Sequence, residues 1–253
     1  MNLESIVKIV TENWPMFLRG AGMTLYISII STILGSIIGI LVGVIRTIPV
    51  PERGIRKGLL KVVNGLLSAY IEFFRGTPMM VQAMVIYYGS AEALGINMDK
   101  YIAAILIVSI NTGAYMSEIV RGGIVSIDQG QFEAAHALGM NHVQTMTNVV
   151  MPQVIRNILP ATGNEFVINI KDTSVLNVIS VSELYFATKS IAGSTFIFYP
   201  PFLIACILYF VMTFTVTCIL RYFERKIEGP KNFSLAGNQM QVARPEDILR
   251  RTK

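Results

Sequence analysis

The sequence has 253 residues, of which 53% are hydrophobic and only 15% are charged. A soluble domain usually carries about 25% charged residues, so this composition argues against an ordinary soluble enzyme, a disordered chain, a coiled coil or a collagen-like fibre. The net charge of +5 is typical of a membrane protein with Lys and Arg at its cytoplasmic surface, and we expect no nucleic-acid partner.

Long apolar stretches predict five membrane-spanning helices, because a helix needs roughly 20 apolar residues to cross a lipid bilayer. Residues 20–45, 101–117 and 190–220 contain no charged side chain. Two other stretches are apolar except for a few charges, namely Glu72 and Arg75 in one and Arg156 and Glu165 in the other. The predicted spans are about residues 20–45, 62–91, 101–121, 152–174 and 196–222.

Small residues recur at every fourth position of the first span, at Ser31, Gly35, Gly39 and Gly43. This spacing places them on one face of a helix. Small residues on one face allow two helix backbones to approach closely. We therefore expect this face to pack against another helix and assign it no chemistry.

Basic residues predict the orientation of the spans, since Lys and Arg are enriched on the cytoplasmic side. Five lie between Arg46 and Lys61 and eight more follow from Arg221 onward, whereas the opposite side holds four. We expect the N-terminus outside and the C-terminus in the cytoplasm. The predicted domains are a membrane domain over residues 1–228 and a polar cytoplasmic tail over residues 229–253.

The cytoplasmic segment after the third span predicts a short amphipathic helix over about residues 129–143. Glu133 lies in its first turn, where the helix dipole favours a carboxylate. Ala134 and Ala135 are small enough for close contact with another surface, and Gly139 can end the helix. From these residues alone, a helix lying on lipid headgroups is as reasonable as one that docks on a protein.

The most specific signal is a set of short motifs that occur in one order along the chain. Glu133-Ala134-Ala135, followed by Gly139, resembles the EAA loop of ATP-binding-cassette (ABC) importer permeases. Further motifs resemble the polar amino acid permeases of the histidine, glutamine and arginine type. These motifs are Phe74-Arg75-Gly76-Thr77-Pro78, Tyr115-Met116-Ser117-Glu118-Ile119, Arg121-Gly122-Gly123-Ile124 and Lys171-Asp172-Thr173-Ser174. The resemblance covers about residues 20–225, with Val175 standing where the family often has Leu.

This resemblance implies an all-α membrane protein with five transmembrane helices and a cytoplasmic coupling helix, the type I ABC importer permease architecture. The chain would be the permease subunit of an ATP-driven importer that moves a polar or cationic amino acid across the cytoplasmic membrane. It would not itself be an enzyme. Glu133, Ala134, Ala135 and Gly139 would lie where the ATPase docks.

The resemblance also implies the partners. They are a dimer of ATP-binding-cassette ATPases, a second permease chain (identical or homologous), an extracytoplasmic amino acid-binding protein and the lipid bilayer. The chain has no G-x-x-x-x-G-K-[ST] phosphate loop, so ATP and Mg²⁺ would be bound by the partner ATPase and no cofactor by this chain. No metal site is expected, because His136 and His142 are poorly spaced for one.

Charged residues at membrane depth are costly and are usually functional. With a rise of about 1.5 Å per residue, Arg75 and Glu165 are both expected near the middle of the bilayer. A guanidinium binds a carboxylate through two hydrogen bonds, so we assign Arg75 to the substrate carboxylate and Glu165 to a positive substrate group. Glu72 is expected to orient Arg75 or to contact substrate, and Thr77 and Asn164 are further predicted contacts.

A structural interpretation of these charges stays open, because buried charges pair whether or not they bind a ligand. Arg75 would then pair with Glu72 or Glu165 and hold helices together. Residues 171–174 are expected to end the fourth span. A role in structure or gating is favoured for them over substrate contact.

Three other functions fit the sequence less well. A secondary transporter driven by an ion gradient usually has repeated halves and more spans. A membrane enzyme would need the two histidines beside the glutamates, but the histidines are predicted in the cytoplasmic segment, roughly 20 Å of bilayer away. A non-catalytic scaffold gains nothing from charges within the membrane.

Overall fold

The computed structural model describes residues 3–51 and 53–228, and all regular structure within them is helical. The predicted all-α class is therefore confirmed. The predicted tail over residues 229–253 lies outside the described residues. The helices are α1 (Leu3–Arg46), α2 (Ile55–Gly76), α3 (Met79–Leu94), α4 (Lys100–Val125), α5 (Gln129–Ala137), α6 (His142–Thr145), the π-turn η1 (Met146–Val150), α7 (Met151–Asp172), the 3₁₀ segment η2 (Thr173–Ile179), α8 (Leu184–Thr195) and α9 (Tyr199–Glu228).

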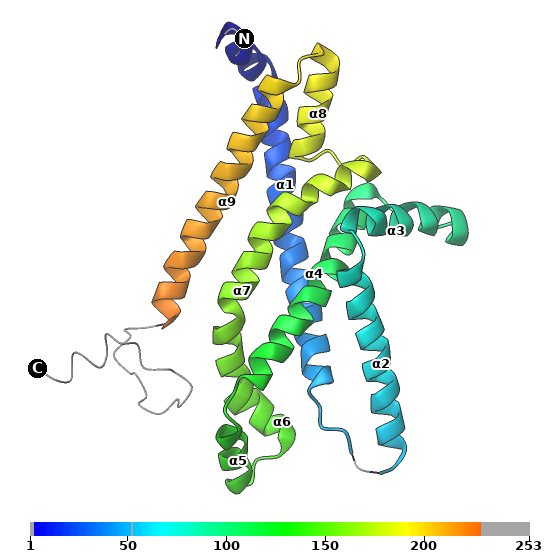
Figure 1. The fold of residues 1–253 in the computed structure, drawn as a ribbon, viewed down its shortest axis with the longest axis vertical. Coiled ribbons are helices and arrows are strands. Elements are labelled where there is room, and N and C mark those ends of the chain that lie inside the picture. The colour runs from blue at the N-terminus through cyan, green and yellow to red at the C-terminus, as the bar shows by residue number, and fades with distance from the viewer. Residues whose placement is uncertain (1–2, 52, 229–253) are drawn as a thin grey trace, which may run out of the picture.

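The first predicted span is only part of α1, which has 44 residues. At 1.5 Å per residue such a helix is about 66 Å long, which exceeds the roughly 30 Å of bilayer hydrocarbon. Its N-terminal part packs beside α8 and α9 through Ile9, Phe17, Leu184 and Ile204, which are buried together. The helix thus links one end of the molecule to the other (Figure 1).

The small residues of α1 lie against α4, as predicted. A Cβ atom built on Gly39 would come within 2.3 Å of the Met116 Cβ atom, and one on Gly35 within 2.6 Å of the Thr112 Cβ atom. At Gly43 the corresponding distance to Val120 is 2.8 Å. These separations are far below van der Waals contact, so only glycine lets the two backbones approach this closely.

The second predicted span is not one straight helix. The chain leaves helical geometry at Thr77, with φ −122° and ψ 147°, and α3 begins after Pro78. The Pro78 ring clashes with helical geometry at the residue before it, which forces Thr77 into an extended conformation. Beyond the break, α3 turns away from the direction of α2 (Figure 1).

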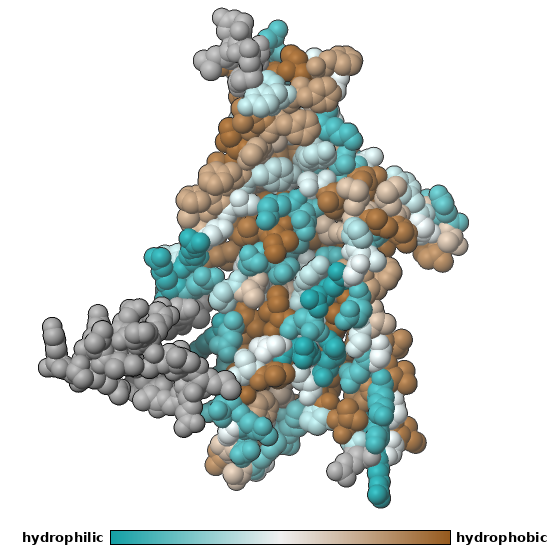
Figure 2. Space-filling view, viewed as in Figure 1, coloured by the Kyte–Doolittle hydropathy of each residue, from teal (hydrophilic) through white to brown (hydrophobic). Residues whose placement is uncertain are grey.

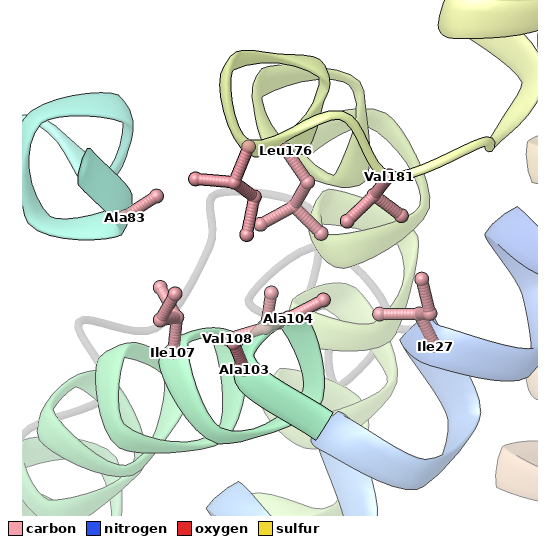
Figure 3. Packing of buried hydrophobic residues seen from close by; sticks show 9 residues of the cluster. Ile27, Ala83, Ala103, Ala104, Ile107, Val108, Leu176 and Val181 are labelled. Carbon is pink, nitrogen blue, oxygen red and sulfur yellow. The ribbon is translucent and has the colours of Figure 1, made fainter. Parts of the chain in front are cut away.

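A buried apolar cluster joins four distant segments at this turn. Ile27 of α1, Ala83 of α3, Ala103, Ala104, Ile107 and Val108 of α4, and Leu176, Ile179 and Val181 from η2 and the link after it pack together. Figure 3 shows these side chains meeting between the ribbons. A second cluster packs α4 onto η1 and α7 through Val120, Ile124, Val150 and Val154.

Much of the apolar surface stays on the outside of the molecule. Large side chains such as Phe210, Val211 and Phe214 of α9 are more than half exposed, and hydrophobic residues cover much of the visible surface in Figure 2. Within the described residues three helical stretches are long and apolar enough to cross a membrane, Val7–Arg46, Lys100–Val125 and Tyr199–Lys226. Exposed apolar helices of this length are typical of a chain embedded in lipid.

The predicted cytoplasmic helix over residues 129–143 is two shorter helices. Asp128 caps the N-terminus of α5 by accepting a hydrogen bond from the backbone N–H of Gly130 at 2.7 Å. The helix ends before Gly139, which has φ +79°, and α6 begins at His142. A positive φ lies outside right-handed helical geometry, so the helix cannot continue through Gly139. Glycine adopts this conformation readily, whereas L-residues rarely do.

Candidate functional site

A cavity of about 330 Å³ opens where the α2–α3 break faces α4 and α7. Polar side chains from positions nearly one hundred residues apart in the sequence line it. Its lining residues are Thr77, Pro78, Met79, Asn111, Tyr115, Glu165, Ile168, Asn169 and Asp172. A concave site with a few converging polar groups is the usual form of a small-molecule site.

The helix break supplies one wall of the cavity, and a buried glutamine holds it in shape. Gln82 donates hydrogen bonds from Nε2 to the backbone carbonyls of Phe74 and Thr77, each at 2.9 Å. Asn111 of α4 donates to the Gln82 Oε1 atom at 2.9 Å. The carbonyls released by the break are therefore satisfied by side chains, as backbone groups away from water require.

A second set of hydrogen bonds fixes α7 against α1 and α4 behind the cavity. Asn169 donates to the Thr32 hydroxyl at 2.8 Å and accepts from the Thr112 hydroxyl at 3.1 Å. All three side chains are buried. Because both ends of the Asn169 amide are used, the amide determines the register of α7 relative to the other two helices.

Arg75 lies in the last turn of α2, where the negative end of the helix dipole favours a cation. Its guanidinium carbon lies 5.4 Å from the centre of the Tyr115 ring, a cation–π geometry. Tyr115 lines the cavity. Arg75 itself is exposed and is not among the residues that line the cavity, so it adjoins the cavity only through Tyr115.

The structure brings only some of the predicted substrate residues together. Thr77 and Glu165 line the cavity, and Arg75 adjoins it through Tyr115. Glu72 is exposed on α2 and does not line it. Asn164 lines a different cavity, which faces α9 beside Leu220 and Arg221.

Sequence reasoning missed Asn111 and Gln82 as contributors to this region, and it gave substrate contact second place at Asp172. Gln82 and Asn111 are polar residues inside apolar runs, a signal that was available in the sequence. Asp172 was expected to have a structural or gating role at the end of a span. It does end α7, and its side chain lines the cavity as well.

No ion pair within the described residues joins Arg75 to Glu72 or Glu165. The pairs there connect Lys8 with Glu12, and Glu118 with both Arg46 and Arg121. The alternative in which Arg75 holds helices together through a glutamate therefore has no contact to support it. Glu165 and Asp172, which line the cavity, also form no ion pair within the described residues.

The end of the molecule that carries α5 and α6 has a separate arrangement of charges. Glu118 of α4 pairs with Arg46 at the end of α1 and with Arg121, whose Nη2 atom is 3.0 Å away. A cavity of about 490 Å³ lies beside Arg46 and Arg121 and is also lined by His136 and His142.

The described residues contain no group of three or more His, Cys, Asp or Glu side chains that could hold a metal ion.

The segment α5–α6 presents a mixed surface at this end. Glu133 and Ala134 are exposed, whereas Ala135 is buried against the rest of the chain. Leu138 and Val143 are 83% and 68% exposed. A short exposed helix followed by large exposed apolar side chains is suited to contact with another protein.

Comparisons with known proteins agree along most of the chain. The family model "Binding-protein-dependent transport system inner membrane component" matches residues 35–229. The chain is 33% identical to the arginine transport system permease protein ArtQ of Bacillus subtilis (strain 168), over 85% of this chain and 94% of that protein. It is 35% identical to the glutamine transport system permease protein GlnP of Escherichia coli (strain K12), again over 85% and 94%.

Solved structures show the same architecture. A crystal structure of an amino acid ABC transporter with histidines superposes with a TM-score of 0.76 at 35% identity, covering 89% of this chain and 99% of that chain. An inward-facing structure of the MetNI methionine ABC transporter gives a TM-score of 0.65 over 83% and 97% of the two chains. At 19% identity this second likeness shows the fold alone.

Proposed function

Since the chain belongs to the family of binding-protein-dependent transport system inner membrane components, we propose that the cavity between α2, α3, α4 and α7 is its passage for a polar or cationic amino acid. The chain is a permease subunit of an ABC importer and is not itself an enzyme. Relatives that carry arginine, glutamine and nopaline permease names support an amino acid substrate.

The observation that carries this proposal is a cavity that contains a carboxylate and has an arginine next to one of its lining residues. Glu165 lines the cavity, and Arg75 lies over the ring of Tyr115, which lines it too. An α-amino acid carries a carboxylate and an ammonium group. Arg75 would bind the carboxylate in a two-pronged hydrogen bond and Glu165 the ammonium. Thr77, whose carbonyl and hydroxyl lie at the helix break, supplies neutral contacts.

The proposed arrangement in the membrane has five crossings, by α1, the α2–α3 pair, α4, α7 and α9. The basic residues after Arg46 and after Arg221 support a cytoplasmic location for the first loop and the C-terminus, with the N-terminus outside. In this arrangement residues 1–228 form the permease domain and residues 229–253 a cytoplasmic tail. Segment α5–α6 then lies in the cytoplasm and α8 outside.

The proposed partners follow from this arrangement. An ATPase dimer would dock on the exposed α5–α6 surface, with Glu133, Ala134, Ala135 and Gly139 forming the coupling segment. ATP and Mg²⁺ would be bound there by the ATPase. A binding protein would deliver the amino acid from outside. A second permease chain, identical or homologous, would complete the passage.

Reconstitution tests this function directly. The chain is co-expressed with its ATPase and binding protein, inserted into proteoliposomes and supplied with radiolabelled amino acids and internal ATP. We expect uptake that requires ATP, the ATPase and the binding protein together. Uptake that follows an imposed proton or sodium gradient without ATP would favour the secondary transporter instead.

A further inference from the structure

We infer that a second cavity, the basic cavity between the ends of α1 and α4 and the segment α5–α6, binds a phosphate group, carried by an anionic phospholipid or by a small soluble ion. Its volume of about 490 Å³ lies within the range of roughly 300–1,000 Å³ that is usual for ligand sites. It shares no lining residue with the proposed amino acid passage. The proposed function therefore gives it no role.

Four basic side chains from different helices line the basic cavity. Arg46 ends α1, Arg121 belongs to α4, and His136 and His142 belong to α5 and α6. The lining includes no Asp or Glu. Within the described residues, the one carboxylate that pairs with either arginine is Glu118, which accepts from both. One carboxylate shared by two guanidinium groups leaves a net charge of +1, even when both imidazoles are neutral.

Several donors of this set remain available to a ligand. Arg121 donates from Nε and Nη2 to Glu118 at 3.3 and 3.0 Å, whereas its Nη1 atom forms no hydrogen bond within the described residues. The Arg121 side chain is 42% exposed. The rings of His136 and His142 likewise donate to no other described residue. A guanidinium binds phosphate through paired hydrogen bonds, and a neutral imidazole can donate one more.

The position of the basic cavity matches the depth of lipid headgroups in the proposed membrane arrangement. Two candidate membrane spans, Val7–Arg46 and Lys100–Val125, end at it, and α5–α6 lies at the same end of the molecule (Figure 1). Ile124 and Met146 line the cavity and belong to a buried apolar cluster. An apolar wall strengthens ionic contacts beside it, and basic pockets between membrane helices bind phospholipid headgroups.

The basic cavity lies on the face of α5 away from the proposed ATPase-docking surface. Gln129, Phe132 and His136 line it and are three or four residues apart, which places them on one face of the helix. Ala134 is two residues from both Phe132 and His136, about 200° of rotation from each, and so faces the opposite side. A bound phosphate would join α5–α6 to α1 and α4 and leave the docking surface accessible.

The purified permease–ATPase complex in detergent provides the test, with no amino acid or binding protein present. In one arm, native mass spectrometry measures how much phosphatidylglycerol the complex retains relative to the zwitterionic phosphatidylcholine. In the other arm, glycerol 3-phosphate and inorganic phosphate are titrated into the complex by calorimetry. We expect saturable binding in at least one arm.

Arg121→Gln and His136→Leu should each weaken the binding of the phosphate-bearing probe by about tenfold or more, as the loss of a hydrogen bond to a charged group predicts. His136→Leu leaves both ion pairs of Glu118 intact, so it keeps the test valid if Arg121→Gln lowers the yield. Arg156→Gln, at an exposed arginine on α7 that does not line the cavity, is the control. Size-exclusion profile and co-purification of the ATPase show that each complex is assembled.

The two arms distinguish the source of the phosphate. Retention of phosphatidylglycerol that falls in the cavity variants, without binding of the soluble ions, assigns a lipid headgroup. Binding of the soluble ions with the same dependence assigns a soluble phosphate.

The inference is overturned if the wild-type complex binds neither soluble ion and retains phosphatidylglycerol no better than phosphatidylcholine. It is also overturned if Arg121→Gln and His136→Leu bind as tightly as Arg156→Gln. Failure of the proposed function looks different, because amino acid uptake would then be absent while phosphate binding persists.

Discussion

Gln82, near the start of α3, donates a hydrogen bond to the backbone carbonyl of Phe74 in α2, with 2.9 Å between Nε2 and O. This bond crosses the helix break that shapes the candidate passage. The Gln82 side chain is only 3% exposed, and the carbonyl has lost its helical partner because the next residues leave the helix. One buried amide thus maintains a wall of the cavity.

Replacing Gln82 with Leu should destabilise the break. The carbonyls of Phe74 and Thr77 would lose their main donor, and a buried polar group without a partner costs about 1–3 kcal/mol. We expect a lower Tm for the purified complex and reduced amino acid uptake. Gln153→Leu is a matched control, because Gln153 of α7 donates to the carbonyl of Val149, one turn earlier in the adjoining η1. Equal Tm values for the two variants would contradict this role.

Gly39→Ala should weaken the contact between α1 and α4. The added methyl group would come 2.3 Å from the Met116 Cβ atom, so the helices must separate, and overpacking of this kind typically costs about 1–3 kcal/mol. Thermal stability of the solubilised chain and its yield in the membrane report the change. Gly22→Ala, with nothing within 4 Å of the new atom, should leave both measurements near wild type. A Gly39 variant as stable as the Gly22 variant would argue against close packing here.

Arg75→Ala and Glu165→Gln should each reduce ATP-dependent uptake by about tenfold or more, because a hydrogen bond to a charged group contributes about 1.5–3 kcal/mol. Initial uptake rates in proteoliposomes provide the measurement. Glu92→Gln, which changes a carboxylate outside the cavity, is the control. Wild-type rates with wild-type substrate preference in both variants would refute the assignment of these residues.

Gly139→Leu should impair coupling to the ATPase. Gly139 has φ +79°, a conformation that costs an L-residue about 1–2 kcal/mol, while the space around it is open. We therefore expect the Leu variant to impair coupling through backbone strain and not through a steric clash. Gly139→Asn is the informative comparison, since Asn tolerates this conformation. We expect ATPase co-purification and transport to fall in the Leu variant and to persist in the Asn variant. Normal coupling with Leu would rule out this role for Gly139.

The buried carboxyl of Glu183 should make the stability of the folded protein depend on pH. Its side chain caps α8 by accepting hydrogen bonds from the N–H groups of Tyr185 and Phe186 at 2.8 and 2.7 Å, and the Tyr209 hydroxyl donates to it at 2.9 Å. Burial raises the pKa of Glu183 above its ordinary value, an effect that outweighs the opposing influence of these hydrogen bonds.

A raised pKa in the folded state means that the protonated carboxyl favours folding. The protonated Glu183 carboxyl contributes its full stabilisation of the folded state below the unfolded-state pKa of about 4.3. This stabilisation is lost as the pH rises through the folded-state pKa. The Tm of the wild-type complex, measured at increasing pH, should therefore fall relative to that of Glu183→Gln. The exposed Glu12→Gln variant should track wild type. A Tm difference that does not change with pH would disprove the prediction.

Much of the architecture was accessible from residue pattern. The uncharged stretches predicted the regions that form α1, α4 and α9, because lipid-facing helices must be apolar over the width of a bilayer. The glycine spacing from Gly35 to Gly43 predicted a close helix contact, because residues four apart lie on one face of a helix. The motifs beginning at Glu133 and at Phe74 indicated the family to which the chain belongs.

What the sequence could not decide was which side chains face the same space. Neighbouring residues on a helix are separated by about 100° of rotation, so Glu165 lines the cavity while Asn164 faces α9. The partner helix and its register decide this outcome, and here they depend on Asn169 bonding to Thr32 and Thr112. The same packing places Asp172 and Thr77 in the lining of one cavity. Local pattern determined the helices of this protein, and only their packing determined its charged cavity, because helix packing depends on contacts between residues far apart in the chain.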